Sequence, residues 1–302
     1  MDNHKRRVVI TGMGVVAPNG IGVDNFWDSL VHGRSGVRRI THFDASTYPC
    51  QVAAEVSDFD PTDYIDTKTA KRLDKFVHYS LVASSLAIKD AEIKVPYKDP
   101  YRIGVFLGTA IGGGETSEIQ HTIFIEKGFK RIAPYTVFGI STHSASAAIS
   151  ETFLFKGPNT TISSGCNSGL DACYLAYNEI LMGDADIMIV SGAEAPITPY
   201  IVSVFSACGV LSTQNGDPRT TVRPYDINAS GMVLGEGGGT IVIEELNHAM
   251  KRGAKVYGEI LGYSSINEAY VYGIETDTEP MAKAFKVALE KASLNPSVMS
   301  LK

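Results

Sequence analysis

Hydrophobic and polar positions divide the chain into short apolar runs separated by amphipathic segments. The apolar runs end in glycine or other small residues and cover residues 7–16, 102–108, 160–164, 187–193, 239–244 and 255–263. Runs of this length and composition are typical of strands, and a continuous run such as 187–193 is typical of a strand buried on both faces of a sheet. Between them, apolar residues recur at helical spacing, most clearly over 73–91, 167–182 and 280–292. Strands that alternate with helices predict a layered α/β fold.

Several of the predicted helices have recognisable ends. Asp24 can cap a short helix that carries Trp27 and Leu30 and closes at Gly33. Gly183 follows the helix over 167–182 and suits its C-terminal cap. Pro280 opens the last predicted helix, because proline is favoured in the first turn.

Composition and charge narrow the classes of function. The chain has 302 residues, of which 44% are hydrophobic and 20% charged, as in an ordinary globular protein of about two domains. The 33 acidic residues outnumber the 27 lysines and arginines, which gives a net charge of −6. This balance argues against a dedicated nucleic-acid binder, although it leaves room for a local basic patch.

The cysteine pattern indicates reduced thiols. Cys50, Cys166, Cys173 and Cys208 form no CxxC pair, and no Cys/His spacing fits a zinc site. The apolar run near the N-terminus is short and interrupted by glycine, so we expect no signal peptide. No run of 18 apolar residues occurs, so we expect no membrane span and a cytoplasmic location.

The strongest chemical signal is the segment TTISSGCNSGLDAC over residues 160–173, which joins a β-branched strand to a long helix. Cys166 falls at the junction, as the nucleophile does in a strand-to-helix elbow. The free N–H groups at a helix N-terminus favour a thiolate and can stabilise an oxyanion during acyl transfer. The alternative interpretation is an inert buried cysteine at a tight turn. The other three cysteines are expected to be ordinary core or surface residues.

Five segments together resemble one family. The chain is similar to the N-terminal three-quarters of a β-ketoacyl-acyl-carrier-protein synthase of the elongating type, which includes the ketosynthases of type II polyketide systems. The resemblance implies a thiolase-like layered αβαβα fold of two similar halves. Residues 1–253 would form the half with the nucleophile, and residues 254–302 the start of an incomplete second half. The matching segments are RRVVITGMGVVAPNG, GVFLGTAIGGG, the Cys166 elbow, DADIMIVSGAEA and VLSTQNGDPRTTVRPYDINASGMVLGEGGGTIVIEEL.

The resemblance also implies roles for individual residues. Cys166 would accept the acyl chain, and its own backbone N–H would be one of two oxyanion-hole donors. Ile111 and Phe205 match positions that line the acyl pocket, although plain core packing explains them equally well. No cofactor is implied, because the phosphopantetheine group arrives on the carrier protein.

A basic segment is the candidate contact for that carrier protein. Lys68, Lys71, Arg72 and Lys75 follow an i, i+3, i+4, i+7 spacing that would place them on one helical face. Without the resemblance, a solvated helix face is the simpler interpretation. In related synthases this segment docks the acidic carrier protein, and Lys68, Lys71 and Arg72 match those positions. A local basic patch on an acidic protein suits electrostatic steering of an acidic partner.

The groups that the family uses for decarboxylative condensation are not found in this sequence. They are two histidines, one of them in an H-G-T motif, and none of the seven histidines here precedes Gly-Thr. We therefore expect an acyl-accepting chain that needs a missing C-terminal part or a second subunit. A non-catalytic partner that shapes the acyl tunnel and sets chain length is the alternative, although such partners usually replace the cysteine that is present here.

Two further expectations follow from the resemblance. A homodimer or heterodimer is expected, because in the family the strand after the cysteine helix pairs across a dimer interface. The family's usual Arg-Ala-Leu-Ser appears here as Gly-Val-Leu-Ser over residues 209–212. This change favours a specialised pathway over housekeeping fatty-acid synthesis, but it leaves fatty-acid and polyketide pathways both open.

Overall fold

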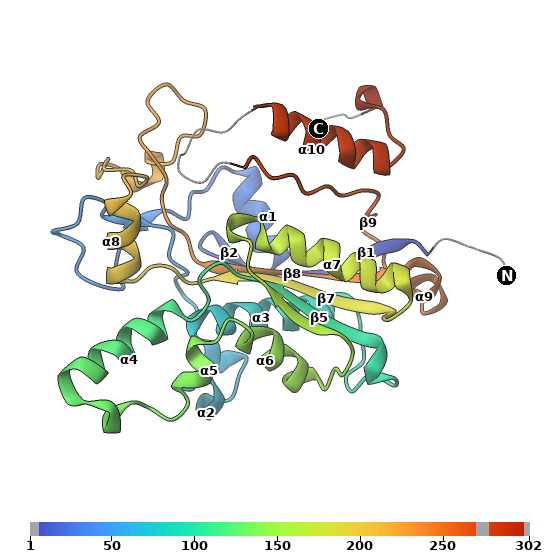
Figure 1. Ribbon diagram of the computed structural model, residues 1–302, viewed down its shortest axis with the longest axis horizontal. Helices are drawn as coiled ribbons and strands as arrows, with labels where there is room; N and C mark the ends of the chain where they lie inside the picture. Colours follow the sequence, from blue (N-terminus) through green and yellow to red (C-terminus); the bar gives the residue numbers. More distant parts are fainter. Residues whose placement is uncertain (1–5, 270–277, 299–302) are drawn as a thin grey trace.

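A mixed sheet forms the centre of the molecule (Figure 1). The computed structural model describes residues 6–269 and 278–298. Within these ranges the sheet has seven strands in the order β2-β1-β8-β7-β5-β6, and β9 also pairs with β1. Strands β5, β6 and β7 run parallel, whereas β8 is antiparallel to β7 and to β1. The strands are β1 (Val8–Ala17), β2 (Gly20–Ile21), β5 (Ile103–Gly108), β6 (Asn159–Ile162), β7 (Ile187–Glu194), β8 (Gly237–Glu245) and β9 (Gly258–Glu259).

Helices cover both faces of this sheet (Figure 1). Alternate side chains of β5 point to opposite faces, as the strand geometry requires. Val105 and Leu107 pack with α3 (Lys75–Asp90) and α6 (Ser144–Phe153). Phe106, on the other face, packs with α7 (Ser168–Met182). The predicted α/β layering is therefore present, and β5 is buried along its whole length between the two layers of helices.

The remaining helices lie around this core. Two of them, α4 and α5, project from the edge of the molecule below the sheet in Figure 1. The hydrophobic pattern did not predict α4, and most of its large apolar side chains are exposed, so it has no buried stripe. The helices are α1 (Val23–Val31), α2 (Thr67–Ala70), α4 (Gly114–Lys127), α5 (Thr136–Ile140), α8 (Pro199–Ala207), α9 (Leu246–Lys251) and α10 (Thr278–Lys291). A small second sheet pairs β3 (Arg38–Arg39) with β4 (Val52–Ala53).

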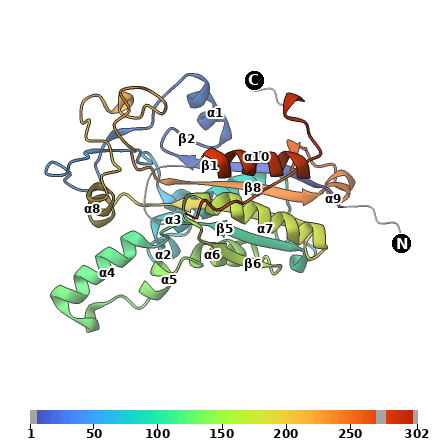
Figure 2. The ribbon, with the colours of Figure 1, turned by 45° about the horizontal axis from the view of Figure 1, so that its top comes forward.

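Helix α10 lies on the α7 side of the sheet. Figures 1 and 2 both show α10 on that side. Tyr263 stacks on Tyr174 of α7, with ring centroids 4.1 Å apart and planes 11° apart. The predicted strand over 255–263 is largely wrong, because only Gly258–Glu259 pairs with β1. The predicted domain boundary at residue 253 stays a prediction.

Two other expectations are corrected by the backbone. Gly22, not Asp24, is the N-cap of α1, and Asp24 lies in its first turn. The strand after the cysteine helix, β7, cannot pair across a dimer interface, because β5 and β8 occupy its two edges. In the described part of the chain, β6 is the edge strand at that end of the sheet, next to β5.

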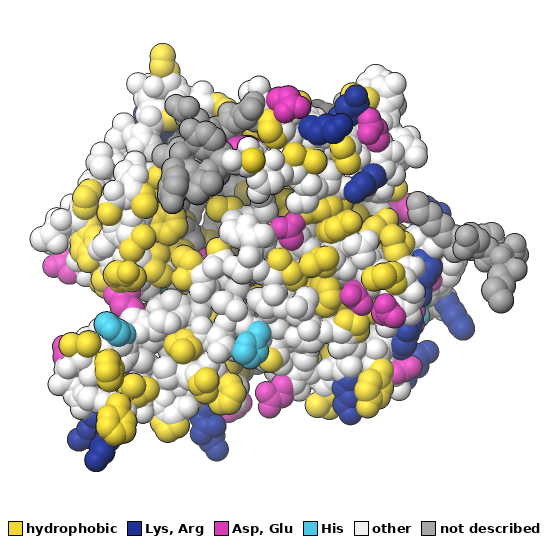
Figure 3. All heavy atoms as spheres, viewed as in Figure 1, with side chains coloured by type: hydrophobic (Ala, Val, Ile, Leu, Met, Phe, Trp, Pro, Cys, Tyr) yellow, Lys and Arg dark blue, Asp and Glu magenta, His cyan; other side chains and the backbone are white. Residues whose placement is uncertain are grey.

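Uncovered apolar side chains lie on several helices. Figure 3 shows them gathered over α8 and around α7 and α10. Leu170 and Met182 on α7 and Phe285 on α10 are each about two-thirds exposed. On α1, Trp27 is 64% exposed. Surfaces of this kind are typical of regions that contact another chain or segment.

Candidate active site

Three parallel strands end together and define one edge of the sheet. Gly108 at the end of β5 is in register with Ile162 at the end of β6 and with Gly192 near the end of β7. In open α/β sheets, ligands bind beyond the carboxyl ends of the strands. The loops that leave these three strands are therefore the place to look for a site.

Cys166 lies in the turn between β6 and α7. It is the middle residue of a 3₁₀ turn over Gly165–Asn167, and it is exposed. Helix α7 begins with the residue that follows this turn. Gly165 has φ of +70°, a conformation that favours glycine. The Ser164 N–H donates to Ser168 Oγ at 3.0 Å, and the Ser168 hydroxyl lies 2.6 Å from the Gly165 carbonyl oxygen. The turn thus holds the thiol open to solvent at the N-terminal end of a 15-residue helix.

A glycine lets this helix approach the sheet closely. A Cβ on Gly108 would lie 2.3 Å from the carbonyl carbon and oxygen of Ser168. Real Cβ atoms do not come that close to backbone atoms, so only glycine fits at this point of β5. The first turn of α7, and with it Cys166, therefore lies directly against the end of β5.

The loop that follows β5 borders the cysteine turn. Ser163 Oγ donates to the Ala110 carbonyl oxygen at 3.3 Å, and Ser168 Oγ lies 3.3 Å from the Thr109 carbonyl oxygen. On its other side the loop is held by Glu194 at the end of β7, whose carboxylate accepts hydrogen bonds from residues 109–112. The sequence reasoning missed Glu194. The available signal was a single carboxylate that ends an otherwise apolar, buried strand.

The two predicted pocket residues both lie near α8. Ile111 belongs to the loop after β5, and a Cβ on Gly114 would meet Ile111 Cγ2 at 3.1 Å and Ile201 Cδ1 at 2.7 Å. Phe205 lies one helical turn beyond Ile201 on α8, so the two share a face. Phe205 is half-buried against a small apolar cluster that includes Cys50 and Val52. The acyl-pocket role of Ile111 and Phe205 stays a prediction.

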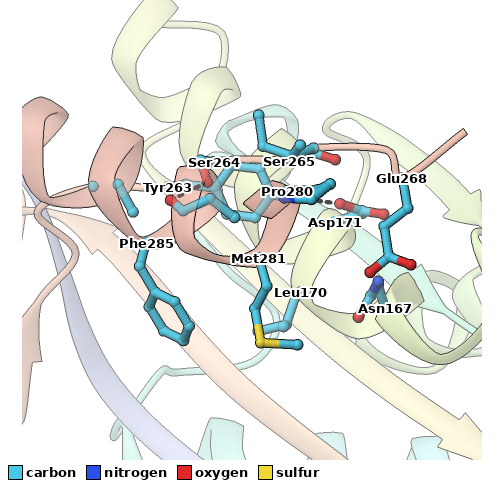
Figure 4. A pocket seen from close by; sticks show the side chains of 14 residues that line it. Asn167, Leu170, Asp171, Tyr263, Ser264, Ser265, Glu268, Pro280, Met281 and Phe285 are labelled. Carbon is cyan, nitrogen blue, oxygen red and sulfur yellow. Dashed lines mark hydrogen bonds between the residues drawn. The ribbon is translucent and has the colours of Figure 1, made fainter. Parts of the chain in front are cut away.

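A cavity of about 510 Å³ opens beside the cysteine turn (Figure 4). Asn167 lines it from the cysteine turn, Leu170 and Asp171 line it from α7, and Tyr263 and Met281 line it from the later segment. The Asp171 carboxylate accepts hydrogen bonds from the hydroxyls of Ser164 and Tyr263. Burial, together with this carboxylate, raises the pKa of Tyr263 to about 12. Asp171 thereby ties the residues before Cys166 to the chain after residue 253.

The basic segment is not one helical face. Lys68 lies in the four-residue helix α2, Lys71 is its C-cap, Arg72 follows in a turn, and Lys75 begins α3. The helix breaks here because Asp74, which is buried, caps the start of α3 by accepting from the Phe76 N–H.

Three of these cations nevertheless line one cavity of about 520 Å³. They are Lys71, Arg72 and Lys75, and Lys75 also forms an ion pair of 3.0 Å with Glu115 of α4. Lys68, Lys71 and Arg72 are all exposed. Their role as docking residues stays a prediction.

The other three cysteines have different surroundings. Cys50 is buried, and burial raises the pKa of the Cys173 thiol to about 11. Cys208 is exposed like Cys166, but it lies at the C-terminal cap of α8. Over residues 6–269 and 278–298, no group of three or more His, Cys, Asp or Glu side chains is placed to hold a metal ion. No helix in the described part of the chain is long and apolar enough to cross a membrane.

Comparison with known proteins assigns the family. Residues 5–249 match the family described as Beta-ketoacyl synthase, N-terminal domain. The chain is 40% identical over 298 residues to a putative polyketide beta-ketoacyl synthase 1 of Streptomyces halstedii, covering 96% of this chain and 70% of that protein. It is 38% identical over 297 residues to a 3-oxoacyl-[acyl-carrier-protein] synthase 2 of a Synechocystis species, covering 98% of this chain and 71% of that one.

Solved structures agree with these relatives. One is a type II polyketide ketosynthase in complex with its acyl-carrier protein, with a TM-score of 0.87 and 30% identity over 97% of this chain and 72% of that one. Another is the ishigamide ketosynthase/chain length factor, with a TM-score of 0.88 and 27% identity over 97% of this chain and 71% of that one. The fold is thus the thiolase-like fold of ketosynthases, as the sequence predicted. The chain belongs to the β-ketoacyl synthase family.

Proposed function

We propose that Cys166 accepts an acyl chain from a carrier-protein thioester, which is the first half-reaction of a β-ketoacyl synthase. The observation that carries this proposal is the position of the thiol. Cys166 is exposed in the turn directly before α7, at the carboxyl ends of three parallel strands. The names of the relatives, 3-oxoacyl synthases and polyketide ketosynthases, support the same chemistry.

The acylation step needs a nucleophile and a place for negative charge. The Cys166 sulfur attacks the carbonyl carbon of the thioester and forms a new S–C bond. The carbonyl oxygen becomes an oxyanion, which the backbone N–H of Cys166 at the start of α7 stabilises. Collapse of this intermediate breaks the bond to the phosphopantetheine sulfur. That thiol leaves with the proton that Cys166 gave up, so the products are acyl-Cys166 and the free carrier protein.

The condensation step calls for groups that this sequence does not contain. The resemblance implies two histidines, and no histidine here stands in an H-G-T motif. His143, the one histidine that small residues surround in the sequence, is an exposed residue at the start of α6. We therefore assign acylation to this chain and propose that the condensation groups come from outside these 302 residues, on a longer chain or on a second subunit.

Replacing the thiol tests the acylation step, and the chain contains a matched control. Cys166→Ala should abolish the mass increase that a palmitoyl-carrier-protein thioester gives, while Cys208→Ala should leave it unchanged, because both thiols are exposed but only Cys166 precedes a helix N-terminus. Intact-protein mass spectrometry with peptide mapping reads the result. Equal acylation of Cys166→Ala would refute the proposal. A wild-type chain that is never acylated, but whose removal changes product chain length, would favour the tunnel-shaping partner instead.

We also propose that an acyl carrier protein docks on Lys71 and Arg72, with Lys68 beside them. The support is that all three side chains are exposed, that Lys71 and Arg72 line a cavity, and that one relative was solved in complex with its carrier protein. The Lys71→Glu/Arg72→Glu variant should slow acylation by carrier-bound palmitate about tenfold and should not slow acylation by a small palmitoyl thioester. Lys130→Glu/Arg131→Glu, on exposed residues beyond α4, is the charge-matched control. Equal slowing by both pairs would contradict specific docking.

Association with another ketosynthase-like chain is part of this proposal. The exposed apolar side chains of α7, α8 and α10 give it physical support. One structural relative is itself a ketosynthase/chain length factor. Whether the products belong to a fatty-acid or a polyketide pathway depends on the acyl chain that the pocket accepts.

A further inference from the structure

We propose that Glu194 is a positioning residue whose carboxylate holds the loop of residues 109–112 in place and thereby sets which acyl chain lengths Cys166 accepts. Glu194 does not act on the reacting atoms. It acts through the loop that lies between it and the cysteine turn. This inference rests on the proposed acylation of Cys166.

Both oxygens of the Glu194 carboxylate accept hydrogen bonds from the loop. Oε2 accepts from the N–H of Ala110 at 2.6 Å and from that of Ile111 at 3.2 Å. Oε1 accepts from the N–H of Gly112 at 3.0 Å and from the hydroxyl of Thr109 at 3.1 Å. Three successive backbone N–H groups thus converge on one side chain from a strand more than 80 residues away.

Convergent backbone N–H groups form a nest that binds an anion. Here the chain supplies the anion itself, because both Glu194 oxygens lie within the nest. The turn is closed further by the Gly112 N–H, which also contacts Thr109 Oγ at 3.2 Å, and Gly112 has φ of +68°. Without a carboxylate these N–H groups would lose their common acceptor, which costs free energy above all at Gly112, the buried one of the three residues. The loop would then move to find other acceptors.

The loop lies beside the cysteine turn, so a change in its position would alter the space open to an acyl chain on Cys166. Its outer carbonyls, those of Thr109 and Ala110, contact the serines on either side of Cys166. Its Ile111 side chain lies beside Gly114 at the start of α4, and Ile201 of α8 lies beside the same glycine. A displaced loop would move Ile111 from its place near Ile201. A long acyl chain would meet this change, whereas an acetyl group would not extend far enough to do so.

The experiment compares acylation rates across chain lengths. Full-length wild type, Glu194→Ala, Glu194→Gln and Glu194→Asp are incubated with acetyl, octanoyl and palmitoyl thioesters of N-acetylcysteamine, and acyl-Cys166 is followed by mass spectrometry. Glu194→Ala should lower the palmitoyl-to-acetyl rate ratio roughly tenfold, the scale expected when a supporting group shifts a site slightly. Glu194→Gln should behave similarly, because its NH₂ would face backbone N–H groups. Glu194→Asp, which keeps the charge, should recover part of the ratio.

Glu151→Ala, an exposed carboxylate on α6, is the matched control and should leave the ratio unchanged. An unchanged ratio in a folded Glu194→Ala variant would overturn the inference while leaving acylation of Cys166 intact. A uniform loss at all chain lengths would overturn it as well, because it would indicate a general structural role.

A second measurement does not depend on acylation. Amide hydrogen exchange at residues 110–112 should be at least tenfold faster in Glu194→Ala than in wild type, with unchanged exchange in β5. Equal exchange would refute the positioning role even if the wild-type chain accepted no acyl group. That last outcome would refute only the proposed function, so the two proposals fail separately.

Discussion

The two ends of β7 carry carboxylates that do different work. Asp186, just before the strand, binds the guanidinium groups of Arg6 and Arg102, with Arg102 donating to both oxygens at 2.8 and 3.0 Å. Glu194, at the other end, binds three backbone N–H groups of a loop. At the amino end the carboxylate joins distant segments by charge. At the carboxyl end it shapes the loop beside an exposed cysteine.

The ends of α7 show the same division. Gly183 closes the helix at the amino edge of the parallel strands with φ of +86°, and Gly165 precedes it at the carboxyl edge with φ of +70°. Both glycines meet a conformational requirement, yet only Gly165 adjoins Cys166. One edge of the sheet therefore carries contacts that join distant segments, and the other carries the proposed site, where the geometry of parallel strands favours ligand binding.

The largest effect should come from filling the gap between β5 and α7. Gly108→Ala places a Cβ 2.3 Å from the Ser168 backbone and should force α7 away from the sheet. We expect a loss of about 3 kcal/mol in the free energy of unfolding, at the upper end of overpacking costs. Acylation of Cys166 should fall about a hundredfold.

Gly239→Ala on β8, where a Cβ meets no atom within 4 Å, is the control for Gly108→Ala and should leave both properties nearly unchanged. Urea unfolding and acyl-transfer rates measure the two effects, and equal behaviour of the variants would contradict close packing at Gly108.

A smaller effect, confined to stability, should come from the amino end. The hydrogen bonds of Arg102 and Arg6 lower the pKa of Asp186 to about 2 from a usual value of 3.8. A lowered carboxyl pKa contributes stability above the unfolded pKa, and this contribution is lost as pH falls from about 4 to about 2. Asp186→Asn should therefore cost about 2 kcal/mol at pH 7, the scale of a charged hydrogen bond, and nearly nothing near pH 2.

Thermal unfolding across pH, beside acylation rates at pH 7, tests the assignment of Asp186. The acylation rate of the surviving folded protein should match wild type. A stability loss that does not depend on pH, or a loss of acylation without unfolding, would contradict a purely stabilising role for Asp186.

The smallest effects on stability should come from the two left-handed glycines. Gly165→Ala and Gly183→Ala should each cost about 1 kcal/mol, because an L-residue is strained at these φ values. Only Gly165→Ala should slow acylation, since it alone changes the turn that holds Cys166. Chemical denaturation and mass-spectrometric acylation of both variants decide the matter. If Gly183→Ala slowed acylation as strongly, the site would depend on the whole helix and not on the turn before it.

Much of the architecture follows from local pattern. The runs 102–108 and 187–193 predicted β5 and β7 within one or two residues, and helical spacing predicted α3 and α7. The place of Cys166 between a strand and a helix was also predicted, because a β-branched run precedes it and a helical pattern follows it. These features depend on neighbours close in sequence, so the sequence reports them directly. The break between Lys71 and Lys75 was missed, because a spacing rule assumes one continuous helix and Asp74 starts a new one.

The sequence by itself determined the α/β layering, the family resemblance and the candidate nucleophile. Only the tertiary structure decided what surrounds that nucleophile. Glu194 and the loop of residues 109–112 are over 80 residues apart, and Gly108 meets Ser168 across 60 residues. The physical reason is that hydrophobic period reports which face of an element is buried, whereas a hydrogen-bond partner depends on the register and order of the strands. That order places β7 next to β5, and it thereby brings a carboxylate to the loop beside Cys166.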